Sequence, residues 1–204
     1  MWDERYSEDG FAYGTEPNTF LKESLQRLQD DFLFRDAPPT CLMLAEGEGR
    51  NAVYMAQLGF QVTGVDISQV GLDKAQRLAK SRGVKITTVL ADLSDYDLGH
   101  EQWDIIVGIS CHLPPAIREK VLSAIPFALK PNGAVIFETY TPDQLKFKTG
   151  GPSEANMMYS AEIFRQAFGN GQLVVERNEE SVRDVVEGKY HKGKAAVVQF
   201  IGRK

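Results

Sequence analysis

The sequence predicts an α/β protein with a doubly wound, mostly parallel sheet of seven strands. Short apolar stretches alternate with amphipathic stretches of helical period along most of the chain, which is the pattern of repeated βαβ units. Residues 104–109 are almost entirely apolar, as expected of a strand that is covered on both faces. An apolar run at 42–44 leads into a glycine-rich turn and then an amphipathic segment, the layout of the first strand, loop and helix of such a sheet.

The first 36 residues predict an arm followed by a helix. Residues 1–18 carry too many aromatic side chains for a disordered tail, so we expect an irregular arm that packs against the rest of the chain. From Thr19 onward, apolar residues recur at helical spacing (Phe20, Leu21, Leu25, Leu28 and Phe32). This helix should stop before Asp36, because two prolines follow shortly after it.

Residues 40–140 predict the cofactor-binding core, in which strands and helices alternate. The expected strands cover residues 42–44, 60–66, 84–90, 104–109 and 134–138. The helices between them begin after the glycine-rich turn, after the capping residue Ser68, and at Pro114-Pro115. Residues 130–133 have the composition of a turn that precedes the fifth strand.

Residues 141–204 predict a lid and a C-terminal hairpin. Residues 143–158 resemble a loop or lid in composition, and 160–168 have the period of a short helix. Residues 173–175 and 195–201 predict the last two strands, joined as a hairpin so that the last strand is antiparallel. With no internal repeat or second core, the sequence predicts a single domain over residues 1–204.

Composition narrows the class of protein. The chain has 204 residues and a net charge of −5, which argues against nucleic acid as the main partner. No run is long enough to span a membrane, and the polar first residues lack the apolar core of a signal peptide, so we expect a cytoplasmic protein. Cys41 and Cys111 form no disulfide framework, and three scattered histidines lack metal-ligand spacing, so we predict no metal.

The glycine-rich turn is the first candidate binding site. Gly47 and Gly49 would let the backbone approach a ligand, and the amides that open the helix at Arg50-Asn51-Ala52 would point the same way. The spacing also fits a dinucleotide-binding fingerprint, but Glu46 and Glu48 would repel a pyrophosphate. A ligand with a positive centre, such as the sulfonium of S-adenosylmethionine (SAM), suits this acidic loop better. The alternative is an ordinary strand–helix turn with solvated glutamates.

Two aspartates follow the next strands, at the edge where such sheets bind ligands. Asp66 ends the second strand, where a carboxylate can accept hydrogen bonds from both ribose hydroxyls; the alternative is a helix-capping aspartate beside Ser68. Asp92 follows the third strand and is a candidate for the adenine amino group, with backbone groups of Ala91 and Leu93 at the ring edge; the alternative is a loop aspartate. Ile67 and Leu93 are candidates to clamp the adenine faces, or are ordinary core residues.

The fourth strand and the last hairpin supply candidates for the acceptor side. His112 is a candidate general base, with a structural histidine as the alternative, and Cys111 is expected to line the pocket because no group that would activate its thiol is evident. His191 is the second candidate base. Lysines 189, 192 and 194 predict a basic rim that attracts an anionic acceptor, with a solvated turn as the alternative.

Taken together, these motifs resemble the class I SAM-dependent methyltransferases, and most closely the bacterial tellurite-resistance (TehB-like) branch. The resemblance covers nearly the whole chain and rests on segments 2–6, 13–18, 47–52, 65–66, 91–93 and 129–133. It implies a Rossmann-like methyltransferase fold in which Gly47 and Gly49 face the methionine part of SAM, Asp66 binds ribose, and Asp92 with Leu93 binds adenine.

The sequence departs from the family pattern in two places. The acid that the family carries on the first strand is Met43 here, and Ala45 and Glu46 replace its first glycine and the following small residue. Glu46 therefore either takes over the role of the missing acid, or the methionine tail of SAM is held differently. The segment after the fourth strand also lacks the Asn/Asp-Pro-Pro-aromatic motif of enzymes that methylate amino groups of bases.

The sequence thus predicts a SAM-dependent methyltransferase that acts on a small molecule, such as a metalloid oxyanion or a thiol, by in-line displacement. A base is needed only if the acceptor arrives protonated. Two alternatives stay open: a NAD-dependent oxidoreductase, favoured by the glycine spacing, and a SAM-binding regulatory or stress-response protein without catalysis. The sequence leaves the oligomeric state undetermined.

Overall fold

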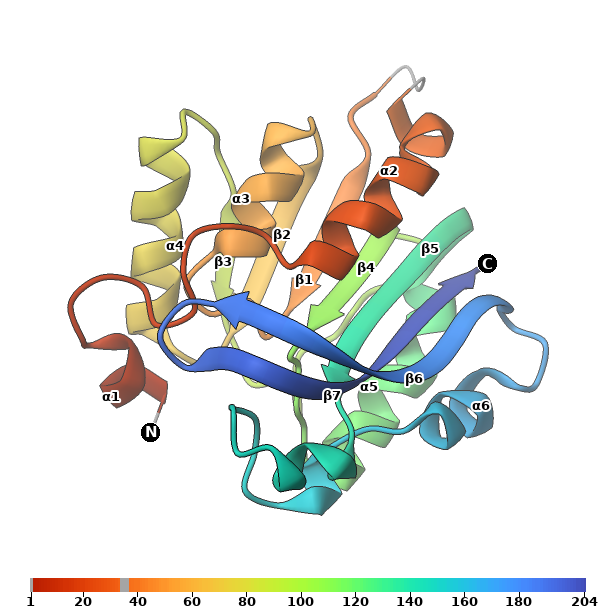
Figure 1. The fold of residues 1–204 in the computed structure, drawn as a ribbon. Helices are drawn as coiled ribbons and strands as arrows, with labels where there is room; N and C mark the ends of the chain where they lie inside the picture. Colours follow the sequence, from red (N-terminus) through yellow and green to blue (C-terminus); the bar gives the residue numbers. More distant parts are fainter. Residues whose placement is uncertain (1, 34–36) are drawn as a thin grey trace.

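The computed structural model describes residues 2–33 and 37–204 and contains one seven-stranded sheet (Figure 1). The strand order is β3-β2-β1-β4-β5-β7-β6; β1 to β5 run parallel to one another, and β7 is antiparallel to both β5 and β6. The predicted fold class is therefore confirmed. The strands are β1 Thr40–Leu44, β2 Gln61–Asp66, β3 Thr87–Leu90, β4 Trp103–Ile109, β5 Leu129–Tyr140, β6 Val174–Glu187 and β7 His191–Arg203.

Helices cover both faces of the sheet. They are α1 Trp2–Tyr6, α2 Thr19–Leu33, α3 Arg50–Gln57, α4 Gln69–Ser81, α5 Pro115–Ala128 and α6 Ala161–Phe168, with 3₁₀ helices η1 Pro142–Lys146 and η2 Ala155–Met157. Along β1, Cys41 and Met43 pack under α2, α3 and α4, whereas Leu42 and Leu44 pack under α5 and α6. This two-sided burial explains why the strands are continuous apolar runs. The predicted stop of α2 before Asp36 falls at residues 34–36, outside the described residues.

The sheet reverses its strand order at β1, which lies between β2 and β4. In a doubly wound sheet, the helices on either side of such a reversal lie on opposite faces, which leaves a crevice beyond the carboxyl ends of the strands. The glycine-rich turn after β1, Asp66 at the end of β2 and Ser110 after β4 all lie at this edge. The fold thus brings the predicted loop and the acceptor-side segment to one place.

The C-terminal hairpin differs from its prediction in length. β6 and β7 together run from Val174 to Arg203, and the turn between them is only residues 188–190, so that His191–Lys194 belong to β7 rather than to a turn. β6 is an edge strand with mostly exposed polar side chains, so it lacks the apolar alternation that marks a strand in a sequence. Residues 130–133, predicted as a turn, lie within β5, although Asn132 has a positive φ of 62°.

The amino-terminal arm lies against the tip of this hairpin (Figure 1). Its first residues form α1 rather than an irregular segment. The Lys189 amide donates to the Ala12 carbonyl (2.9 Å), and the Lys189 ammonium pairs with Glu8 (2.6 Å). Segments from the two ends of the sequence therefore meet over the crevice. Among the described helices, none is both long and apolar enough to cross a membrane.

Candidate active site

The two loop glycines turn out to have different neighbours. Gly47 and Gly49 both have positive φ angles, 64° and 92°. A Cβ on Gly49 would lie 2.6 Å from Cα of Ala75, so this glycine allows α3 to pack against α4. A Cβ on Gly47 would lie 2.6 Å from the hydroxyl oxygen of Tyr6, so the arm covers the loop at this point. The sequence contained the aromatic residue but gave no sign of which loop residue it would meet.

Glu46 caps the helix that the loop opens. Its Oε1 accepts a hydrogen bond from the Ala52 amide at 2.7 Å. Burial raises the pKa of the Glu46 carboxyl to about 8, against the opposing effect of the helix amides and the Arg50 charge. The Ala52 amide, which the sequence predicted to be open to a ligand, is therefore already paired with this side chain.

Glu48 anchors the arm from beneath. Its Oε2 accepts from the Ala12 amide at 2.7 Å, and its Oε1 pairs with the Lys74 ammonium at 2.9 Å; both side chains are buried. Lys74 also donates to the carbonyls of Glu8 and Gly10. The solvated-glutamate alternative is thus wrong for Glu48, and its partners are the arm and α4.

Asp66 lies where the crevice predicts a ribose-binding carboxylate. Its Oδ2 accepts from the Gly47 amide at 2.8 Å and its Oδ1 from the Ser68 amide at 2.9 Å. Burial raises the pKa of the Asp66 carboxyl above its usual value. These contacts are the capping interactions of the alternative interpretation, and they also hold the carboxylate at the edge of the crevice beside the exposed Ile67.

The segment after β3 forms a local turn. Asp92 accepts from the Ser94 amide at 2.7 Å, which is the contact of a loop aspartate. The Ala91 amide donates to the Asp66 carbonyl at 3.0 Å, so the ends of β2 and β3 are joined. Leu93 is buried in the core beneath. The adenine-binding role of these three residues stays a prediction.

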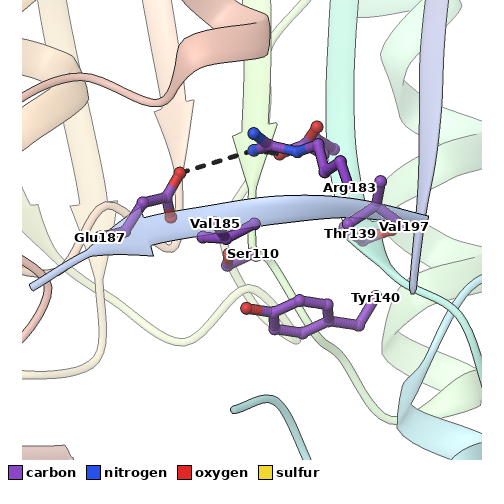
Figure 2. A pocket seen from close by; sticks show the side chains of 8 residues that line it. Ser110, Thr139, Tyr140, Arg183, Val185, Glu187 and Val197 are labelled. Carbon is purple, nitrogen blue, oxygen red and sulfur yellow. Dashed lines mark hydrogen bonds and ion pairs between the residues drawn. The ribbon is translucent and has the colours of Figure 1, made fainter. Parts of the chain in front are cut away.

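A second hollow lies beside the crevice, under the C-terminal hairpin (Figure 2). β4 and β5 supply its floor and β6 and β7 its roof; its lining residues are Ser110, Glu138, Thr139, Tyr140, Arg183, Val185, Glu187 and Val197. We refer to it as the roofed pocket. One ion pair joins its walls, between Arg183 of β6 and Glu138 of β5, and Arg183 also faces Glu187 of its own strand at 3.6 Å. Charged side chains from two strands therefore line the pocket and pair with one another.

Ionic contacts also tie the roof to the cofactor loop. Arg50, the first residue of α3, pairs with Glu187 at 2.7 Å. Asn18, from the arm, donates through its side-chain amide to both Glu138 and Glu187, and its backbone amide donates to the Asn51 side chain at 2.9 Å. Sequence reasoning missed Asn18, Glu138, Arg183 and Glu187, because three distant segments, the arm, β5 and β6, supply them and no local pattern links them.

The two candidate bases differ in their surroundings. Removal from water lowers the pKa of His112 to about 3, and its ring stacks on Tyr140 with ring centres 5.4 Å apart. Burial also lowers the pKa of His191, whose Nδ1 lies 3.6 Å from Glu187. Tyr140 contacts both histidine rings, and Tyr13 lies 4.5 Å from His191. Both histidines are therefore neutral near pH 7.

The remaining candidates are the Cys111 thiol, the hairpin lysines and any metal-binding group. Cys111 is fully buried, and burial together with the charge of Asp66 raises the pKa of its thiol to about 12, which leaves it unreactive. Lys189 pairs with Glu8 and Lys194 faces Asp184 at 3.8 Å, so part of the predicted basic rim is neutralised. Over residues 2–33 and 37–204, no group of three or more His, Cys, Asp or Glu is arranged to hold a metal.

Comparison with known proteins supports the predicted class. Residues 41–133 match a family described as a methyltransferase domain. Among curated proteins, none matches this chain in sequence.

Solved structures share the fold of nearly the whole chain. One, reported for the conversion of a disulfide bond into a thioacetal group during echinomycin biosynthesis, has a TM-score of 0.72 and 18% identity and covers 99% of this chain and 87% of its own. TehB from Haemophilus influenzae has a TM-score of 0.70 and 15% identity over 100% of this chain and 65% of TehB. Magnesium protoporphyrin IX methyltransferase from Synechocystis PCC 6803, with bound S-adenosylhomocysteine, has a TM-score of 0.67 and 16% identity. The match covers 100% of this chain and 92% of the methyltransferase.

The matched segment runs from β1 to the start of β5 and includes the glycine-rich turn, Asp66, Asp92 and Cys111. TehB is one of several structural neighbours of comparable similarity, so these neighbours do not single out the TehB-like branch. Residues 41–133 thus match a methyltransferase domain, and the chain has the seven-stranded fold that solved methyltransferases share, in agreement with the predicted enzyme class and its cofactor, SAM.

Proposed function

We propose that this chain transfers the methyl group of SAM to a small-molecule acceptor held in the roofed pocket. The supporting observation is that the roofed pocket adjoins the cofactor crevice. Ser110 lines the pocket, while the next residue, Cys111, lies close enough to Asp66 for that carboxylate to raise the pKa of its thiol. A methyl donor over the glycine-rich turn and an acceptor under the hairpin would therefore face one another at the end of β4.

The residues at the crevice fit SAM. Gly47 and Asp66 lie together at the ends of β1 and β2, Asp66 is the residue that we propose binds the ribose, and the acidic loop suits a sulfonium cation. When bound, SAM supplies an electrophilic methyl group. The protein's part is to orient the acceptor for in-line displacement, with nucleophile and methyl about 3–3.5 Å apart before reaction, and to exclude water through the arm and the hairpin.

A base is required only for a protonated acceptor, and His191 suits that role better than His112. A group with a pKa of about 3, as His112 has, is too weak a base near pH 7. His191 is neutral and has the Glu187 carboxylate 3.6 Å from Nδ1, where it would stabilise the imidazolium that forms. An acceptor that arrives as an anion needs neither histidine.

For the acceptor we propose a small anion or thiol, including a metalloid oxyanion as in the TehB-like branch. The support is the basic side chains of the pocket and its rim, Arg183 and Lys192, and two structural neighbours, TehB and the protein reported for a disulfide-to-thioacetal conversion. Glu138 and Glu187 also line the pocket, and Arg183 is paired with Glu138. An acceptor must fit between these paired side chains, which favours a small one. From the net charge of −5 we infer that nucleic acid is not the main partner, and a cytoplasmic location remains part of our proposal.

The test is a panel of acceptor classes with SAM, read by release of S-adenosylhomocysteine. Tellurite, selenite, small thiols and small carboxylic acids represent the classes, and calorimetric titrations with SAM and NAD accompany them. Turnover of one class supports the proposal. Tight NAD binding without SAM binding would support the oxidoreductase instead. SAM binding with no product across the whole panel would favour a regulatory protein without catalysis.

A further inference from the structure

One buried guanidinium at the cofactor loop has an unused donor. The Arg50 side chain is only 8% exposed; its Nη2 is committed to Glu187 at 2.7 Å, whereas no described residue accepts a hydrogen bond from its Nη1. A buried donor without a partner is costly, so in a native structure it calls for an explanation such as a bound ligand, ion or water. Arg50 opens α3 directly after the glycine-rich turn, and its guanidinium reaches Glu187 at the end of β6.

The helix itself offers less to an anion than its position suggests. The Ala52 amide at its first turn donates to Glu46 at 2.7 Å, and the Val53 amide donates to the Gly49 carbonyl. An anion at this end of the crevice would therefore find part of the usual set of helix amides occupied by the chain's own carboxylate. The Arg50 guanidinium is the positive group that the same helix still presents.

SAM carries one anionic group, the carboxylate of its amino-acid end. The Asp66 carboxylate at the crevice would repel this carboxylate, whereas Glu46, with a pKa of about 8, is largely protonated near pH 7. The Glu48 carboxylate is paired with the Lys74 ammonium at 2.9 Å. The Arg50 guanidinium is therefore the cation that remains beside the loop to attract the carboxylate of SAM. Resting on the proposed function, we propose that the Arg50 side chain binds the amino-acid carboxylate of SAM through Nη1 while Nη2 keeps its bond to Glu187.

This arrangement joins the two halves of the site. Glu187 lines the roofed pocket and also pairs with Arg50, so the residue that holds the cofactor's carboxylate also holds the roof over the acceptor. Burial strengthens a charge-assisted bond of this kind because little water competes for it. Arg50 is thus a cofactor-binding residue through its side chain, and Glu187 is its positioning residue.

The test compares ligands that differ only at the amino-acid end. S-adenosylhomocysteine carries the carboxylate, its decarboxylated analogue keeps the ammonium but lacks the carboxylate, and 5′-methylthioadenosine lacks the whole amino acid. Affinities are measured by calorimetry for the wild type and for the double variant Arg50→Met/Glu187→Gln, which removes both charges so that neither stays buried alone. Glu187→Gln by itself keeps the guanidinium, and Arg82→Met, an exposed arginine paired with Glu16, is the matched control.

We expect the double variant to bind S-adenosylhomocysteine about 10–100-fold more weakly than the wild type, while its affinity for the decarboxylated analogue changes by less than about threefold. Glu187→Gln and Arg82→Met should keep the wild-type preference for the carboxylate. A folded double variant with that preference intact overturns the role of Arg50 and leaves the methyltransferase proposal standing. A wild type that binds none of the three ligands overturns both.

Discussion

The Oε1 atom of Glu46 lies 2.7 Å from the amide nitrogen of Ala52 and caps α3 from inside the core. The carboxyl group that seemed free to take over the duty of the family's missing acid is thus turned toward the helix. Met43, which stands at the position of that acid, is buried in the core on the α2–α4 side of the sheet. The loop keeps its acidic composition, but one of its carboxyl groups serves the fold.

Stability should fall with rising pH through the titration of Glu46. The pKa of this carboxyl is about 8 in the folded chain against an ordinary value of 4.5, so between these values the folded state holds a proton that the unfolded state has lost. Its contribution is complete below pH 4.5 and declines toward pH 8, by at most about 1.4 kcal/mol per pH unit. Urea unfolding of the wild type and Glu46→Gln at several pH values measures this difference. A difference independent of pH would contradict the prediction.

Replacement of Asp66 should weaken cofactor binding. Asp66→Ala removes a carboxylate proposed to bind the ribose and frees the Gly47 and Ser68 amides, so we expect S-adenosylhomocysteine affinity to fall by about 10–100-fold. Asp92→Ala, which loses its bond to the Ser94 amide, tests the adenine role separately. Calorimetry gives both affinities, with circular dichroism as the check on folding. An Asp66→Ala protein that folds and binds normally would rule out the ribose assignment.

The buried pair of Glu48 and Lys74 should be strongly coupled. Lys74→Met leaves a buried carboxylate without its cation, which should cost about 3–5 kcal/mol of the free energy of unfolding. Adding Glu48→Gln should restore much of that loss, because the Gln side-chain carbonyl can still accept from the Ala12 amide. Denaturant unfolding of both single variants and the double variant completes the cycle. If the losses of unfolding free energy in the two single variants simply add in the double variant, Glu48 and Lys74 do not interact energetically.

The hairpin tip should lose its hold on the arm if a methyl group is added to Gly188. A Cβ there would lie 2.4 Å from the Gly14 amide nitrogen, so Gly188→Ala must push the two backbones apart. Gly171→Ala is the control: its φ of 81° is also positive, but no described atom lies within 4 Å of the added carbon. We expect faster proteolysis of the arm in Gly188→Ala only. Equal cleavage of both variants would mean that backbone strain alone accounts for the effect.

Neutralising the hairpin lysines tests the anionic acceptor. With Lys189, Lys192 and Lys194 changed to Gln, the KM of an anionic acceptor found in the panel should rise by up to about tenfold, and the effect should shrink with added salt. Because Lys189 pairs with Glu8 and Lys194 faces Asp184, most of the change should come from Lys192. A KM that does not move would leave the solvated turn as the interpretation.

The sequence predicted the strands that are buried on both faces, because burial imposes a pattern that can be read locally. The run from Trp103 to Ile109 is buried at every position and was found almost to its bounds. β6 was found only at its first residues, since an edge strand with solvent-facing side chains has no such requirement. The prediction of a turn at residues 130–133 is wrong, because β5 continues through these residues and accommodates the positive φ of Asn132.

The candidate site divides in a similar way. Glycines, a strand-end acid and the segment after β4 are local signals, and the fold brings them to the same edge. Arg183, Glu187 and Asn18 act through partners more than a hundred residues away in several cases, such as Asn18 with Glu138. Pairing between distant side chains leaves no periodicity behind, so only a structure reveals it.

The meeting of arm and hairpin also decides where a label can be attached. A fluorophore attached at position 2, the first residue of α1, would lie on a helix that packs against α4 and would sense any lifting of that segment (Figure 1). The opposite terminus is held at the start of β5, where the Lys204 amide donates to the Gly133 carbonyl at 2.9 Å. Purification handles therefore belong on the carboxyl end, and reporters of opening belong on the amino end.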